Sequence, residues 1–242
     1  QSGNITIDVA ENKTLGYSGA AVNLGAKTLT MSGKGTFNNT NALRLNNASS
    51  KLLLSNTTTV SSVSTSANNS GVDVNEDSTI TSLAVGHTTP VSIAAGKTLS
   101  GGITVTDGSI KLGETGTLAS TVSMSGGTLD ADESLTLSGN LTQSGNITID
   151  VAENKTLGYS GAAVNLGAKT LIMTSDGNGT FNNTNALVLN NASSKLLLAN
   201  TTTVSRVSTS ANNSGVDVNA NSTITALAVG HTTPVSIADG KT

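Results

Sequence analysis

The sequence predicts an all-β fold, a right-handed parallel β-helix (β-solenoid) of about 10–12 coils with almost no helix. Three observations predict this fold. Short runs of alternating apolar and polar residues recur along the whole chain. Aromatic residues make up only 2% of the 242 residues, too few to fill the wide core of a β-sandwich. The chain also repeats itself almost letter for letter, and near-identical units stack end to end naturally.

The composition excludes several classes of protein. Because the chain contains no Cys, it can form neither a disulfide framework nor a thiolate metal site. Its 12 Lys and Arg against 15 Asp and Glu provide no basic surface for a nucleic acid. No run approaches the roughly 18 apolar residues of a membrane span. Disorder of the whole chain is disfavoured, because 36% of the residues are hydrophobic and the net charge is only -3.

A long internal repeat organises the chain. Residues 1–29 and 143–171 are identical, and the match continues to the last residue of the chain. The second copy carries two extra residues near Ser175 and Asp176, so the offset between the copies grows from 142 to 144. We expect one continuous solenoid with three parts: copy one (1–98), a single-copy stretch (99–142) and a truncated copy two (143–242).

The repeat also predicts something about the surroundings of this chain. The sequence begins without Met and stops inside a repeat unit. We therefore expect it to be a segment of a longer tandem array, with any signal peptide or anchor outside it. A segment of such an array would expose unpaired strand edges at both ends, so we also expect self-association through the termini.

The strands are predicted by period-two alternation, which places one set of side chains on a buried face and the other in water. Each run is short and ends in Gly, Asn, Asp or Ser, which form tight turns. No stretch shows a sustained period of 3.6 residues. The predicted strands are residues 5–9, 29–31, 43–45, 72–74, 80–81, 91–93, 103–105, 110–112, 122–124 and 135–137.

The spacing and size of the apolar residues favour a solenoid over a sandwich or a barrel. The runs follow one another at short and fairly even intervals, and no hairpin spacing dominates. Leu, Ile, Val and Ala are of a size that stacks in ladders inside a narrow coil. With three short strands per turn, one coil would use roughly 20–24 residues, and the rod would be roughly 50 Å long.

The differences between the two copies test this assignment of faces. Thr30 and Arg44 each lie between two apolar residues, so alternation points both outward. No difference replaces an Ile, Leu or Val that is predicted to point inward, as a ladder with one buried face requires. Besides the segment around the insertion (residues 32–35 and 174–179), the differing pairs are Thr30/Ile172, Arg44/Val188, Ser55/Ala199, Ser62/Arg206, Glu76/Ala220, Asp77/Asn221, Ser82/Ala226 and Ala95/Asp239.

Two acidic segments are the first candidates for chemistry. Asp130, Asp132 and Glu133 form the tightest acidic group, but only Lys111 lies upstream nearby, and we interpret residues 129–134 as a solvated turn rather than a glycosidase pair. Residues 73–77 resemble the opening of a calcium loop. The sixth and twelfth positions of that loop are not the required Gly and Glu, and copy two loses further carboxylates, so the resemblance to a calcium site is weak.

The remaining polar residues are interpreted structurally. His87 and His231 are the only histidines, one per copy, and each precedes a Pro in a turn, so they form neither a metal site nor a nucleophile–base pair. Thr-x-Thr triplets raise the idea of an ice-binding face, but their spacing is irregular. Glycosylation sequons are numerous, although Asn equally suits tight corners and stacked amides. These sequons include Asn4, Asn12, Asn38, Asn47, Asn56, Asn68 and Asn140.

Several stretches resemble a known kind of protein. The sequences MSGGTLD at 124–130 and LTLSGNL at 135–141 are similar to the repetitive β-helical regions of giant bacterial surface adhesins. Filamentous-haemagglutinin-like exoproteins and autotransporter passengers are the nearest comparison. The resemblance extends along the whole chain in style and rests on composition rather than on a diagnostic motif. It implies export, folding outside the cell, and a role as a stalk or cell-contact rod.

The sequence therefore predicts a non-enzymatic structural or adhesive repeat of a large secreted or cell-surface protein. It assigns no catalytic, cofactor-binding or metal-ligating residue, and no cofactor. The expected partners are neighbouring repeats of the same polypeptide and host, bacterial or abiotic surfaces or glycans, with no nucleic acid and no membrane span. The alternative is a carbohydrate-binding or carbohydrate-cleaving β-helix, which needs a groove lined by charged and aromatic side chains. The four aromatics are too few for such a groove: Tyr17, Phe37, Tyr159 and Phe181.

Overall fold

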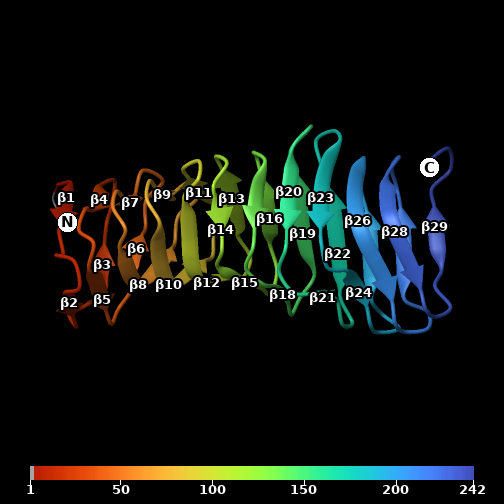
Figure 1. Ribbon diagram of the computed structural model, residues 1–242, viewed down its shortest axis with the longest axis horizontal. Helices are drawn as coiled ribbons and strands as arrows, with labels where there is room; N and C mark the ends of the chain where they lie inside the picture. The colour runs from red at the N-terminus through yellow and green to blue at the C-terminus, as the bar shows by residue number, and fades with distance from the viewer. Residues whose placement is uncertain (1–2) are drawn as a thin grey trace.

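Twelve strands stack along the length of the molecule in one parallel sheet, sheet A. The computed structural model describes residues 3–242, and its parallel strands form a β-solenoid of about 12 turns (Figure 1). The described residues contain no helix. In spatial order, the strands of sheet A are β1 (Ile5–Ile7), β4 (Thr28–Met31), β7 (Lys51–Leu54), β9 (Gly71–Val74), β11 (Thr89–Ile93), β13 (Ser109–Gly113), β16 (Thr128–Ala131), β19 (Ile147–Val151), β22 (Thr170–Thr174), β25 (Lys195–Leu198), β27 (Gly215–Val218) and β29 (Val235–Ile237).

The remaining strands form a second parallel system, sheet B, which completes each coil. In some coils two short strands are separated by a bend, and in others one longer strand takes the place of both. The strands are β2 (Thr14–Tyr17), β3 (Val22–Asn23), β5 (Thr36–Asn39), β6 (Leu43–Leu45), β8 (Thr59–Thr65), β10 (Ser78–Val85), β12 (Thr98–Val105), β14 (Thr117–Leu118), β15 (Thr121–Met124), β17 (Leu135–Leu137), β18 (Leu141–Gln143), β20 (Thr156–Tyr159), β21 (Val164–Asn165), β23 (Gly179–Asn183), β24 (Leu187–Leu189), β26 (Thr202–Thr209) and β28 (Thr223–Val229).

The register of sheet A gives the length of each coil. The step from Val72 to its partner Val91 is among the shortest, and the step from Leu171 to its partner Leu196 is the longest. The shortest coil is slightly shorter, and the longest slightly longer, than the roughly 20–24 residues that the sequence predicts. The longest step contains the two-residue insertion of copy two. Because the chain advances by one strand spacing per coil, residues that are one full coil apart in sequence become neighbours in space.

The core is a single column of apolar side chains laid down by alternation. Leu29, Leu52, Val72, Val91 and Leu112 follow one another across five neighbouring strands of sheet A, and all are buried. Fully burying one such side chain contributes roughly 1.5–3 kcal/mol. Each side chain reaches this burial only because coils lie on both sides of it. The apolar column therefore confirms the predicted fold.

The differences between the copies avoid this column. None of the differing positions outside the insertion is buried in either copy. Thr30 and Ile172 are both partly exposed, and Arg44 is exposed. The outward assignment made from alternation is therefore confirmed.

The insertion in copy two is absorbed locally. Ser175 is buried, and its Oγ accepts hydrogen bonds from the backbone N–H groups of Gly177 and Gly179 at 3.2 and 2.9 Å. The pairing beyond the insertion is unchanged, since Phe181 pairs with Leu157 as Phe37 pairs with Leu15. Two added residues thus widen one turn without shifting the register of the strands.

Candidate functional site

The densest group of charges lies on the outer surface of sheet A. The register of β13 and β16 places Lys111 beside Asp130. The Lys111 Nζ lies 2.9 Å from Asp132 and 3.6 Å from Asp130. Asp132 lies in the predicted turn, but Asp130 belongs to β16 and its side chain is only 17% exposed. The interpretation of Asp130 as part of a solvated turn is therefore wrong, because the strand extends through it.

Burial and crowding of negative charge change the protonation of this group. The pKa of the Asp130 carboxyl is raised to about 6, first by burial and then by the negative charge of Asp132, while Lys111 opposes the rise. Asp150 pairs with Asp130 on the next strand, and its pKa is raised by burial and then by Asp176 and Asp132. Within residues 3–242 no group of three or more His, Cys, Asp or Glu is placed to hold a metal ion.

Other charged residues connect one coil to the next. Glu133 forms an ion pair with Lys155 at 2.6 Å, although the two residues belong to successive coils. Lys155 therefore adds a second basic partner to the acidic group, where the sequence indicates only Lys111. The length of one coil is the signal that would have found this pair, because it is also the sequence separation of the two residues.

Residues 73–77, which resemble the opening of a calcium loop, also form contacts between successive coils. Asp73 forms an ion pair with Lys51 of the preceding coil at 2.6 Å, and Glu76 pairs with Lys97 of the following coil at 2.5 Å. The Asp77 carboxylate accepts a hydrogen bond from the backbone N–H of Thr98 at 2.8 Å. In this arrangement the carboxylates hold neighbouring coils in register.

The histidines lie in the turns where the sequence predicts them. His87 and His231 are exposed, and their carbonyl oxygens accept hydrogen bonds from the hydroxyls of Thr89 and Thr233 at 3.0 and 3.1 Å. Pro90 follows as the second residue of β11, on its outward side. Proline is tolerated at the start of a strand because its missing N–H removes no essential bond there.

Two buried asparagines form hydrogen bonds with the backbone of the next coil. The Asn39 Nδ2 donates hydrogen bonds to the carbonyl oxygens of Asn41 and Ser62 at 2.9 and 2.6 Å, and its Oδ1 accepts one from the Ser62 N–H at 3.2 Å. Asn183 makes the equivalent contacts in copy two, with Arg206 in the place of Ser62. These side chains replace backbone bonds at the bend that divides a coil.

Several asparagines of the sequons serve as corners. The Oδ1 atoms of Asn4, Asn68 and Asn140 each accept a hydrogen bond from a backbone N–H of the next coil, at 2.9 to 3.0 Å. Asn12 has a φ of 59°, in the left-handed region that Asn tolerates better than most residues. These contacts confirm that asparagine suits the corners of this fold.

Threonines form regular outward columns on sheet B. Thr14, Thr36, Thr59 and Thr79 pair in register across four strands, and Thr156, Thr180, Thr203 and Thr223 repeat the column in copy two. Only Thr79 and Thr223 of these columns begin a Thr-x-Thr triplet, so the columns arise from single threonines and not from regularly spaced triplets. The next outward positions of the first two strands are Gly16 and Asn38, so a second threonine column does not accompany the first.

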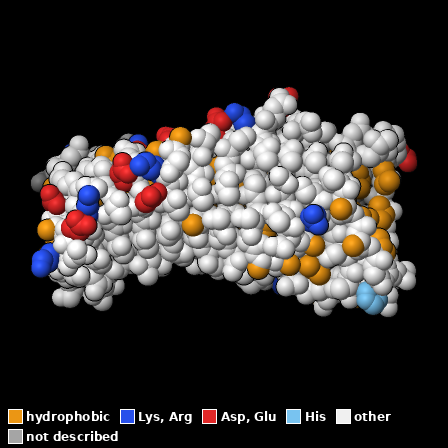
Figure 2. Space-filling view, viewed as in Figure 1, with side chains coloured by type: hydrophobic (Ala, Val, Ile, Leu, Met, Phe, Trp, Pro, Cys, Tyr) orange, Lys and Arg blue, Asp and Glu red, His pale blue; other side chains and the backbone are white. Residues whose placement is uncertain are grey.

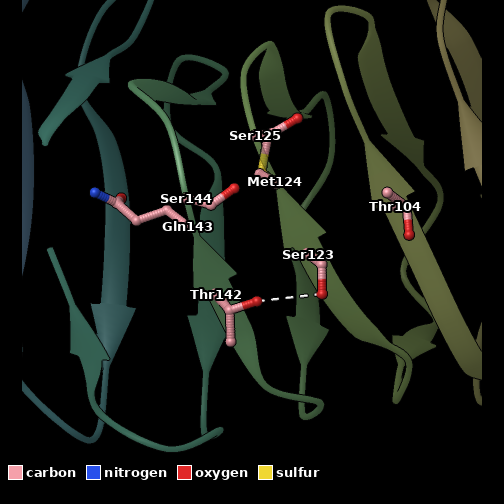
Figure 3. A pocket seen from close by; sticks show the side chains of 7 residues that line it. All are labelled: Thr104, Ser123, Met124, Ser125, Thr142, Gln143 and Ser144. Carbon is pink, nitrogen blue, oxygen red and sulfur yellow. Dashed lines mark hydrogen bonds between the residues drawn. The ribbon is translucent and has the colours of Figure 1, made fainter. Parts of the chain in front are cut away.

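A shallow groove of about 270 Å³ crosses the outer face of β12, β15 and β18 (Figure 3). Thr104, Ser123 and Thr142 pair in register along it, and the Thr142 hydroxyl donates to the Ser123 Oγ at 3.2 Å. Met124 is buried beneath these hydroxyls. The residues that line the groove include no charged and no aromatic side chain.

Gln143 occupies a position that alternation assigns to the core. It pairs with the buried Met124 and points away from Thr104 and Ser123 (Figure 3). Its Nε2 donates to the carbonyl oxygen of Leu166 at 3.2 Å, and its Oε1 is buried with no hydrogen-bond partner among the described residues. Its duplicate, Gln1, lies outside the described residues.

Three of the four aromatic side chains are buried inside the column, and Tyr17 of the N-terminal coil is partly buried against it. Tyr159 and Phe181 are buried and stacked with ring centroids 5.8 Å apart, and Tyr17 stacks on Phe37 at 6.3 Å. The Tyr159 hydroxyl donates to the carbonyl oxygen of Ala162 at 2.6 Å, which satisfies its polar end. These rings stabilise neighbouring coils and present no platform to a sugar.

The outer surface differs along the molecule. On the face drawn in Figure 2, most charged side chains lie over the N-terminal coils, the middle is largely uncharged and polar, and hydrophobic side chains gather toward the C-terminal end. No family model, curated protein or solved structure matches the chain. No helix long and apolar enough to cross a membrane occurs among the residues that the structure describes.

Proposed function

We propose that the chain is a non-enzymatic structural segment of a large bacterial cell-surface protein, acting outside the cell as a rigid stalk or cell-contact rod of the adhesin type. One observation carries the proposal. A single apolar column extends through the stacked coils, and each coil is buried by its neighbours. In such an architecture length follows from the number of coils, so reach is the property that repetition of the unit increases.

The pattern of substitution supports this function. Outside the insertion, the two copies keep every buried residue and differ only on the surface, where Ser62 becomes Arg206 and Glu76 becomes Ala220. Constant packing with a variable exterior suits a scaffold whose surface contacts other molecules. The ion pairs and amide bonds between coils serve the same end, because they join each coil to the next.

The carbohydrate alternative finds no specific support. Sugar binding on a solenoid needs exposed aromatic rings beside polar or charged groups, whereas Phe37, Tyr159 and Phe181 are buried. In the densest charged group of sheet A, Lys111 forms ion pairs with Asp130 and Asp132. We therefore propose no catalytic residue and no cofactor.

The rod is tested by small-angle X-ray scattering on the chain and on a genetic tandem of two chains, both at a protein concentration below any self-association. The proposal predicts that the tandem doubles the longest dimension while the radius of gyration of the cross-section stays constant. A compact, folded-back tandem of unchanged length would contradict it. Far-UV circular dichroism on both proteins checks that each is folded.

The surface role is tested with beads that carry the folded chain, compared with beads that carry the heat-unfolded chain. The proposal predicts that only the folded chain retains the beads on host cells, bacteria or abiotic surfaces. A glycan array and a screen for depolymerised polysaccharide are run in parallel. Specific glycan binding with polysaccharide cleavage, and no retention of beads, would overturn the proposal in favour of the alternative.

A further inference from the structure

The only two arginines of the chain lie alone on the outer face of sheet B. Arg44 belongs to β6 and Arg206 to β26, and no other residue in the strands of sheet B is charged. Both side chains are exposed, and within residues 3–242 neither guanidinium forms an ion pair or a hydrogen bond. The lysines in the strands of sheet A each pair with an aspartate instead, namely Lys51, Lys111 and Lys195. The two arginines of sheet B are therefore available to a group from outside the chain.

Each copy of the repeat carries one of these arginines, at different positions. Copy two has Val188 where copy one has Arg44, and it has Arg206 where copy one has Ser62. Arg44 pairs in register with Ser64, so Ser62 is its diagonal neighbour on the adjacent strand. Strand spacing and rise per residue place such diagonal Cα atoms roughly 8 Å apart, within the reach of an arginine side chain. The loss of one arginine is thus matched by the gain of another close by.

A third difference between the copies belongs to the same patch. Copy two has Ala226 where copy one has Ser82, and Ala226 pairs in register with Arg206. Outside the segment around the insertion, four differing pairs fall in strands, and three of them lie on this face of sheet B. Ser82 is exposed in copy one, where a further coil follows, so the exposure of this face does not depend on the end of the rod. The variation between the copies is thus concentrated around the arginine.

The polar side chains around Arg206 can donate hydrogen bonds. A hollow of about 390 Å³ opens on the outer face here, and its lining includes Asn182, Thr184, Ser205 and Thr225. The Ser205 hydroxyl donates to the Asn182 Oδ1 at 2.9 Å, which leaves the Nδ2 of that amide as a donor. A guanidinium presents its N–H groups in a planar fork that matches the two oxygens of a carboxylate. The hollow therefore suits a carboxylate.

We propose that Arg206 in copy two, and Arg44 in copy one, each bind a carboxylate of an acidic peptide segment in a partner protein. Val188 and Ala226 flank Arg206 and offer a surface to the aliphatic part of such a peptide, as is common around an arginine at a protein interface. An acidic polysaccharide is disfavoured, because several neighbouring cations would be needed to hold it and the strands of sheet B offer one in each copy.

The proposal also gives repetition a purpose. One such contact is weak, since an exposed ion pair gains little in water. A partner with several acidic segments binds several copies at once, and its avidity then exceeds the affinity of one site.

The inference rests on the proposed role of the chain as a contact rod, but the two fail separately. Beads that carry the chain with Arg44→Val and Arg206→Ser should be retained less than wild-type beads. Equal retention of the two kinds of bead would leave the rod its function and overturn only this site.

The class of ligand is tested by nuclear magnetic resonance, because two arginines give two side-chain Nε–Hε signals. The probe is an acetylated hexapeptide of alternating glutamate and alanine, and the control peptide has glutamine in place of glutamate. We expect the acidic peptide to shift both signals saturably at low salt and the control peptide to shift neither. No shift with the acidic peptide, an equal shift with the control, or tighter binding of polygalacturonate per carboxylate would overturn the proposal.

The positions are tested with substitutions that the repeat itself contains. Arg44→Val and Arg206→Ser each place in one copy the residue of the other copy, so both variants should fold, as circular dichroism verifies. Together they should weaken binding of the fluorescently labelled acidic peptide roughly fivefold or more, as measured by anisotropy. Lys34→Ser removes an exposed charge between β4 and β5 and should leave binding unchanged. Unchanged binding in the double variant, or an equal loss in the lysine control, would overturn the two sites.

A transfer of the arginine separates its position from its chemistry. Adding Val188→Arg to the double variant recreates in copy two the arrangement of copy one and should restore binding of the peptide. In a chain with Arg44→Val, where only copy two binds, Arg206→Lys keeps the charge without the planar fork and should lower the affinity about two- to threefold. A chain that binds no better after Val188→Arg, or a lysine that binds as tightly as the arginine, would overturn the assignment.

Discussion

The same sequence has two environments in this molecule. Residues 5–29 form the first coil, and the identical residues 147–171 lie in the middle of the rod. The first strand of the end copy stops at Ile7, whereas its interior duplicate continues to Val151. Leu15 is exposed at the end and Leu157 is buried inside. Local sequence therefore sets which side chains point inward, but neighbouring coils decide whether those side chains are shielded from water.

This difference shows that each coil stabilises its neighbours and is stabilised by them. An isolated coil has an inward apolar set but no surface on which to bury it, so its stability comes from the two interfaces that it forms. A coil at the end has one such interface. Identical substitutions in the two copies should therefore cost different amounts of free energy, and the difference measures one interface.

The largest expected effect is in the core. Leu157→Ala should lower the free energy of unfolding by about 2–5 kcal/mol, because it leaves a cavity between packed coils. Leu15→Ala removes the same atoms from a half-exposed site and should cost about 1 kcal/mol or less. Guanidinium unfolding at a protein concentration below any association measures both variants. Equal costs would contradict the role of the neighbouring coil.

A smaller loss of stability is expected when the buried side-chain amide of Asn183 is removed. Asn183→Ala leaves the backbone groups of Arg206 without their partners and should cost about 1–3 kcal/mol. The adjacent Asn182 is exposed and accepts a hydrogen bond from the Ser205 hydroxyl, so Asn182→Ala should change stability by less than about 0.5 kcal/mol. Thermal unfolding of the two variants compares them directly. If Asn182→Ala were as costly, burial of the amide would not be the cause.

The acidic group predicts a dependence of stability on pH. The pKa of Asp130 is about 6 in the folded chain and near 3.8 in the unfolded chain, so between these values the folded state binds more protons. Stability should therefore fall as pH rises from about 4 to 6, and the raised pKa of Asp150 acts in the same direction.

Asp130→Asn should flatten this dependence and raise the melting temperature at pH 7. The exposed Asp107→Asn is the matched control and should keep the wild-type slope. Melting temperatures at constant ionic strength across this pH range provide the measurement. A steeper slope in the Asp130 variant would mean that the carboxylate is stabilising and that Lys111 outweighs burial.

The smallest expected loss of stability follows the removal of an ion pair that lies between interior coils in both copies. Lys51 with Asp73 and Lys195 with Asp217 lie at 2.6 and 2.8 Å with about half of each lysine exposed. Lys51→Met and Lys195→Met should each cost less than about 1 kcal/mol, and the two costs should agree. Chemical unfolding in low and high salt measures them. A large difference between the copies would show that position along the rod matters beyond the end coils.

The sequence predicts the interior of this fold well. Period-two alternation identifies the inward side chains, including Val72, Val91 and Leu112, because burial on one face is a local property of a strand. Strands such as β5, with the sequence TFNN, are missed because Thr and Asn on the outward side also suit turns. The weak local pattern there is overridden by pairing with neighbouring coils.

The surface groups are harder to predict, because their partners are one coil away in sequence. Glu133 and Lys155 meet only when the coil length is known, and so do Asp130 and Asp150. The coil length varies along the rod, so a fixed period does not bring all of these pairs into register. The column of threonines on sheet B is hidden by the same variation.

Hydrogen exchange on the two identical segments is the most direct measurement of the account. Residues 5–17 and 147–159 have the same intrinsic exchange rates, and longer peptides that reach Thr30 or Ile172 differ in mass. The experiment is run at a protein concentration below any self-association, so that the N-terminal coil stays uncovered. We predict that the interior segment exchanges at least tenfold more slowly than the end segment. Equal exchange of the two segments would contradict the claim that the neighbouring coils, rather than the local sequence, exclude water from the core.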